Sequence, residues 1–130
     1  MHILLATDAD WVVDEVSAAV GGADTTIVVC RDGRDVAPYV SERAPDVAVL
    51  DLQSGSMGGM AVAMDLRLDE SGGRIPHVPI VLLLDRDADI HLARRSGADG
   101  WLVKPLDPIR LNKAISDVAK GLSYSEAFSG

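Results

Sequence analysis

The sequence predicts an α/β fold, a doubly wound five-stranded parallel sheet with five helices on its faces. Two observations carry this prediction. Short apolar runs alternate with segments of helical spacing along most of the chain. The runs also lack polar alternation, which is typical of strands buried on both faces. Such βα alternation favours a parallel sheet with right-handed crossovers.

Each element has its own local signal. Residues that are β-branched or leucine-rich predict strands at 2–7, 25–30, 46–51, 79–85 and 100–104. Apolar residues at helical spacing predict helices at 11–20, 36–44, 60–68, 90–95 and 107–121. Asp10 is a candidate N-cap for the first helix, and Pro38 fits only the first turn of the second. Asp107 followed by Pro108 is an N-cap and a first-turn proline for the fifth helix.

Length and composition indicate a single domain and argue against some classes of binding partner. The 130 residues, 48% of them apolar, suit a single domain at 1–121 followed by a frayed tail at 122–130. A net charge of −8 without a basic stripe argues against direct binding to nucleic acid or anionic membranes. We expect the lone Cys30 to be a small, buried apolar residue. The sequence shows no evident signal peptide or membrane span. We therefore expect a cytoplasmic, soluble protein.

Charged residues stand at the ends of several predicted strands. Asp8 follows the first strand, Asp51 ends the third, Asp85 ends the fourth and Lys104 ends the fifth. Because sites in open α/β sheets form at the carboxyl ends of the strands, we expect these side chains to meet at one edge.

The chemistry of that set is specific. Two carboxylates suit Mg²⁺, and a carboxylate is a competent nucleophile towards a phosphoryl group. Phosphoryl transfer further needs positioning and a fixed cation, which Lys104 supplies. The three histidines lack ligand spacing for zinc, and no Gly-rich phosphate loop follows the first strand.

Three stretches resemble the receiver domain of two-component response regulators. They are HILLATDAD at the start, PDVAVLDL at 45–52 with Met57 and Gly59 after it, and SGADGWLVKPLDP at 96–108. The resemblance covers residues 2 to about 120. It implies the flavodoxin-like strand order 2-1-3-4-5 and a phosphorelay role.

The resemblance also implies roles for individual residues. Asp51 would accept a phosphoryl group from a histidine kinase or phosphotransfer protein, and Lys104 would contact the phosphoryl oxygens. Asp8, Asp51 and the backbone carbonyl of Gln53 would bind Mg²⁺. Trp101 matches the aromatic position that swings inward on activation. Any catalysis would be limited to self-phosphorylation and autodephosphorylation at Asp51.

Four positions depart from the family pattern and mark an atypical receiver. Thr7 stands where the first of two acids is expected, which should weaken Mg²⁺ binding. Leu84 replaces a Ser or Thr whose hydroxyl would bond the phosphoryl group. Asp85 replaces a small residue and brings a negative charge near that group. The loop at 54–59 has three glycines and lacks the usual proline.

Three functions follow from this balance. The first is a stand-alone receiver phosphorylated on Asp51. The alternative is a pseudo-receiver, a docking module that works without phosphorylation. The third is a flavodoxin-like domain that binds an anion or nucleotide. In each case the expected output face, for a protein partner or a homodimer, combines the fourth helix, fifth strand and fifth helix, with Arg94, Arg95, Trp101 and Arg110.

Overall fold

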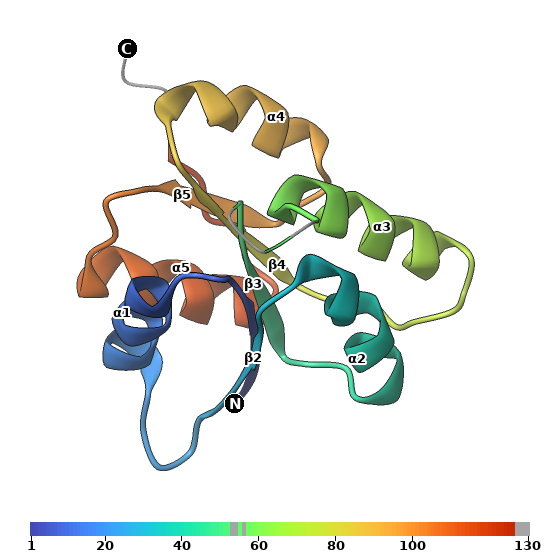
Figure 1. The fold of residues 1–130 in the computed structure, drawn as a ribbon, viewed down its shortest axis with the longest axis horizontal. Helices are drawn as coiled ribbons and strands as arrows, with labels where there is room; N and C mark the ends of the chain where they lie inside the picture. Colours follow the sequence, from blue (N-terminus) through green and yellow to red (C-terminus); the bar gives the residue numbers. More distant parts are fainter. Residues whose placement is uncertain (53–54, 56, 127–130) are drawn as a thin grey trace.

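The predicted five-stranded parallel sheet is confirmed by the computed structural model, which describes residues 1–52, 55 and 57–126. The strands lie in the order β2-β1-β3-β4-β5, all parallel (Figure 1). Their bounds are β1 His2–Ala6, β2 Thr26–Cys30, β3 Val47–Asp51, β4 Ile80–Leu84 and β5 Gly100–Val103. This order places β3 at the centre of the sheet with β1 and β4 on either side, so the end of β3 lies at the centre of its carboxyl edge.

Helices cover both faces of the sheet. They are α1 Asp10–Val20, α2 Val36–Glu42, α3 Gly59–Ser71, α4 Ile90–Arg95 and α5 Pro108–Ala119, with 3-10 turns η1 Gly33–Asp35 and η2 Asp87–Asp89. α1 lies beside α5 on one face, and α2, α3 and α4 lie on the other (Figure 1).

The alternation of strand side chains between two cores explains why the sequence shows no polar alternation. In β1, Leu4 and Ala6 enter the core under α2, α3 and α4, whereas Ile3 and Leu5 enter the core under α1 and α5. Both sets are fully buried. Every position of such a strand must therefore be apolar.

The edge strand β2 departs from this pattern. Its residues Thr26 to Val29 are only partly buried or exposed, and Cys30 alone is buried. The expectation that every run is buried on both faces is therefore wrong for β2. The physical reason is position, since an edge strand has a neighbour on one side only.

Of the two predicted helix N-caps, the structure confirms Asp107 and contradicts Asp10. Asp107 accepts a hydrogen bond from the Arg110 backbone N–H and Pro108 opens α5, as predicted. Asp10 does not cap α1. It is the first helical residue, and its exposed carboxylate pairs with Arg31 at 2.7 Å.

Residues 122–126 correct the expectation of a frayed tail. Tyr124 forms a parallel β-bridge with Gly100, so the segment lies along the outer edge of β5. Residues 127–130 lie outside the described part. Within the described chain, no helix has both the length and the apolar character needed to cross a membrane.

Candidate functional site

Asp51 forms the centre of the charged cluster predicted at the strand ends. It is the last residue of β3 and is completely buried. The Thr7 hydroxyl, at the end of the neighbouring β1, donates to Asp51 Oδ2 at 2.6 Å. The Lys104 ammonium, which directly follows β5, donates to Asp51 Oδ1 at 2.5 Å. A buried carboxylate needs such hydrogen bonds and a counter-charge, because desolvation otherwise disfavours its ionised form.

Lys104 binds a second carboxylate as well. Its Nζ atom donates to Asp85 Oδ1 at 2.8 Å, so the ammonium bridges the ends of β3 and β4. Burial lowers the pKa of Lys104, but its hydrogen bonds to Asp51 and Asp85 outweigh that effect, and the pKa lies above the ordinary 10.5. Lys104 therefore stays charged throughout the physiological range.

Trp11 shields this cation from solvent. Its ring, in the first turn of α1, lies with its centroid 5.5 Å from Lys104 Nζ, a cation–π distance. Trp11 is half exposed. The ring thus forms one wall of the site, between the charged cluster and water.

Asp8 directly follows Thr7 at the end of β1 and is exposed. Its Oδ2 accepts a hydrogen bond from the Gly55 backbone N–H at 3.2 Å. Gln53, whose carbonyl was expected as a Mg²⁺ ligand, lies outside the described residues. In the described part of the chain, no three His, Cys, Asp or Glu side chains gather as a metal-binding group.

The donor set nevertheless fits Mg²⁺ chemically. That ion is usually held by one or two carboxylates and keeps several waters, and the site offers Asp8 and Asp51. Thr7 adds a neutral hydroxyl where a third carboxylate would add charge. The hydroxyl is engaged, since it donates to Asp51 and accepts from the Ala9 backbone N–H at 3.1 Å. We therefore expect affinity lower than a three-acid site would give.

Leu84 and Trp101 lie outside the charged cluster. Leu84 is completely buried in the core under α2, α3 and α4, and its side chain offers no hydrogen-bonding group. Trp101 is partly buried against the same core, and its indole N–H donates to the Glu126 carbonyl at 3.3 Å. The switch role of Trp101 stays a prediction.

Sequence reasoning missed two contacts of the site. From the sequence, Thr7 is treated only as a missing acid, and the signal available for its contact with Asp51 is its position at the end of the first predicted strand. Nothing in the sequence indicates that Trp11 lies over Lys104. Asp85 was expected to repel a phosphoryl group, and the structure adds its ion pair with Lys104.

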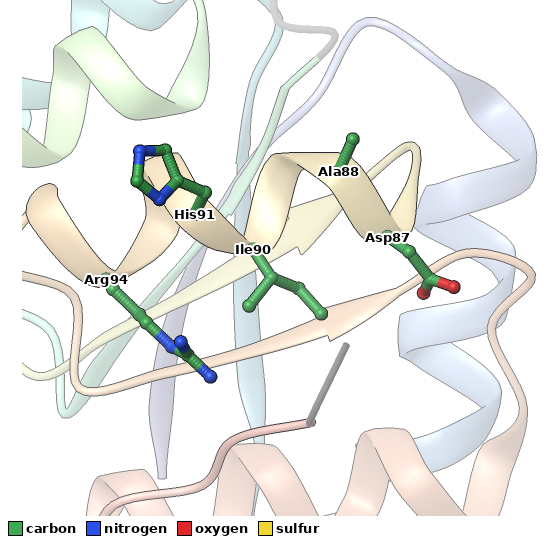
Figure 2. Close-up of a pocket in the computed structure, with 5 residues that line it drawn as sticks. All are labelled: Asp87, Ala88, Ile90, His91 and Arg94. Atoms are coloured by element: carbon green, nitrogen blue, oxygen red, sulfur yellow. The ribbon is translucent and has the colours of Figure 1, made fainter. Parts of the chain in front are cut away.

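A separate pocket of about 320 Å³ lies on the face of η2 and α4. Figure 2 shows its lining residues, which are Asp87, Ala88, Ile90, His91 and Arg94. None of the charged cluster lines it. This pocket therefore belongs to the α4 surface and is distinct from the Asp51 site.

Known proteins share this architecture and sequence pattern. The model of the response regulator receiver domain family matches residues 3–116. The chain belongs to the response regulator receiver domain family. Among solved structures, the signal receiver domain of response regulator NarL from Mycobacterium tuberculosis is 27% identical. It has a TM-score of 0.78, and the match covers 92% of this chain and 96% of that one.

Full-length relatives extend well beyond the receiver. The DNA-binding response regulator MtrA of Mycobacterium tuberculosis is 32% identical over 112 residues, which are 85% of this chain and 46% of that protein. The DNA-binding transcriptional regulator NtrC of Escherichia coli is 27% identical, over 88% of this chain and 24% of its own length. The chain thus spans about half or less of these relatives, and DNA binding is stated of those proteins.

Proposed function

We propose that this receiver accepts a phosphoryl group on Asp51 from a histidine kinase or phosphotransfer protein and signals through protein–protein contacts. The observation that carries the proposal is the pairing of buried Asp51 with Lys104 across 53 residues of sequence. A nucleophilic carboxylate held by a fixed cation is the minimum that phosphoryl transfer requires.

Phosphoryl transfer to Asp51 forms one bond to phosphorus and breaks another. A carboxylate oxygen of Asp51 forms the new bond to phosphorus as the donor's nitrogen–phosphorus bond breaks, and the donor histidine keeps the bonding electron pair. Lys104 moves its hydrogen bond from Asp51 to a phosphoryl oxygen and neutralises its charge. Bound Mg²⁺, held by Asp8 and Asp51, would neutralise the remaining phosphoryl charge.

Two local features oppose fast transfer. Asp51 is completely buried, so the Lys104 or Thr7 hydrogen bond has to give way before a donor reaches the carboxylate. Asp85 competes for Lys104 and repels a phosphoryl dianion, by an amount on the order of 1 kcal/mol or more at 4–6 Å. We infer slow phosphorylation.

A pseudo-receiver is the second candidate, and one observation favours it. Lys104 already binds two carboxylates, which gives the cluster internal charge compensation without any phosphoryl group. Leu84 in addition provides no hydroxyl to transmit phosphorylation. In this case the domain would be a docking module whose binding is independent of Asp51.

Intact mass after incubation with acetyl phosphate and Mg²⁺ separates the two. A gain of one phosphoryl group in the native chain, absent from Asp51→Asn, supports the receiver function. No gain in the folded protein, with a working receiver labelled in parallel, refutes it in favour of the docking module. Omission of Mg²⁺ in a third sample tests the cofactor.

A further inference from the structure

The outer edge of β5 is occupied by the chain's own C-terminal segment, residues 122–126. The Trp101 backbone N–H donates to the Tyr124 carbonyl at 3.0 Å, and the Tyr124 N–H donates to the Asp99 carbonyl at 3.2 Å. Tyr124 and Glu126 are partly buried, whereas Ser123 and Ser125 are exposed. This period of two is that of a strand added to a sheet.

Glu126 is the anchor of the segment. Its Oε1 accepts a hydrogen bond from the Val103 backbone N–H at 2.9 Å, in place of the next main-chain acceptor. Its two carboxylate oxygens also pair with Arg110, at 2.7 Å to Nε and 2.5 Å to Nη2. Burial raises the pKa of Glu126, but the hydrogen bonds from Arg110 and Val103 prevail and lower it.

Arg110 is held in place independently of Glu126. Its guanidinium also donates to the carbonyls of Val103 and Pro105, each at 2.9 Å, and to Asp107 Oδ2 at 3.2 Å. A guanidinium fixed in this way presents its remaining N–H groups as a preformed fork for a carboxylate.

We propose that the β5 edge and Arg110 form a binding site for an extended protein segment that bears an aromatic residue and, two positions later, a carboxylate. Residues 122–126 fill this site in cis, and a partner segment must displace them. Recognition would occur by strand addition, in which main-chain hydrogen bonds supply affinity and side chains supply specificity.

The Arg110–Glu126 pair favours an occupant that carries a carboxylate at this position. Arg110 borders β5 from α5, and its guanidinium is shared between the carboxylates of Glu126 and Asp107. The whole chain carries a net charge of −8, so the Arg110 guanidinium is what lets this edge accept a carboxylate. A segment with one carboxylate in register with Arg110 would bind here although most of the surface repels negative charge.

Binding of the peptide that corresponds to residues 122–126, in labelled form, tests the proposal on the full chain. The cis segment acts at an effective concentration in the ~mM range, so the native chain should bind this peptide weakly. Glu126→Ala should bind it about tenfold more tightly, because the competitor has lost its anchor. The matched Glu→Gln peptide should bind that variant about tenfold more weakly, because the charge-assisted pair with Arg110 is lost.

Hydrogen exchange at the Trp101 and Val103 amides shows whether the edge is open. If these amides exchange faster in Glu126→Ala, or in Tyr124→Ala/Glu126→Ala, and the folded variant binds no peptide, the proposal is overturned. Equal binding of the Glu and Gln peptides overturns it as well. Unchanged exchange in the double variant would show that the segment does not protect the edge, which also refutes the proposal. No phosphoryl donor is needed, so the result is independent of Asp51.

Discussion

Replacing Lys104 by Met tests whether the Asp51–Lys104 pair supports the fold as well as the chemistry. The Lys104 side chain is 12% exposed and Asp51 is 0% exposed, so the substitution leaves a carboxylate buried without its counter-charge. Removing one partner of such a pair costs about 3–5 kcal/mol. The retained Thr7 hydrogen bond, together with the volume of the Met side chain, favours the lower end, about 3 kcal/mol.

The Asp51→Asn background supplies the matched control. There the substitution removes mainly the Lys104–Asp85 pair, in which Asp85 is 32% exposed and better solvated. A pair of that kind contributes about 0–1 kcal/mol. The two backgrounds should therefore differ by roughly 2 kcal/mol, the coupling free energy of Asp51 with Lys104.

Urea unfolding at neutral pH, followed by circular dichroism, measures all four variants. In the native background the melting temperature should also fall by roughly 10 °C, given a few degrees per kcal/mol for a domain of this size. A cost of less than about 1 kcal/mol for Lys104→Met, or the same cost in both backgrounds, would refute the argument that Lys104 compensates a buried charge.

Three further outcomes are expected. Asp85→Ala should speed labelling of Asp51 by acetyl phosphate about tenfold, because a negative charge near the phosphoryl group is removed; an unchanged rate in a mass-spectrometric time course would contradict this. Because the folded pKa of Lys104 lies above 10.5, its contribution to the free energy of unfolding is fully present below 10.5 and is lost as pH rises through the folded pKa. Urea titrations on both sides of that pH should show the loss in the native chain and not in Lys104→Met. Gly59→Ala should destabilise by about 1–3 kcal/mol, because its Cβ would lie 2.8 Å from the Asp51 backbone oxygen, and a melting temperature equal to that of the native chain would disprove the clash.

The meeting of charged side chains at one edge of the sheet was predictable, because the topological rule depends on strand ends alone. Asp51, Asp85 and Lys104 each stand directly at or after an apolar run, and parallel strands bring such positions to one edge. The strand order came from the resemblance of motifs, since periodicity indicates that a strand exists but not which strand is its neighbour. Roles in phosphoryl transfer and Mg²⁺ binding stay predictions, and the Gln53 carbonyl lies outside the described residues.

Partner choice within the site was not predictable. Nothing in the sequence distinguishes a Lys104 that faces Asp51 alone from one that also binds Asp85. Hydrogen-bond geometry decides this, and it depends on atoms brought together by the packed strands.

The sequence by itself determined the two cores, the succession of strands and helices, and the place of the charged residues at the carboxyl edge. The strands and helices follow from the local spacing of apolar residues. The place of the charged residues follows from the parallel direction of the strands, which brings all their carboxyl ends to one edge. Only the tertiary structure decided that Thr7 binds Asp51, that Trp11 covers Lys104 and that residues 122–126 close the edge of β5. The expectation of a frayed tail is wrong for residues 122–126, because Arg110 and the edge of β5 hold them in place. These contacts join residues that are distant in sequence, so they depend on which strands and helices the folded chain brings together.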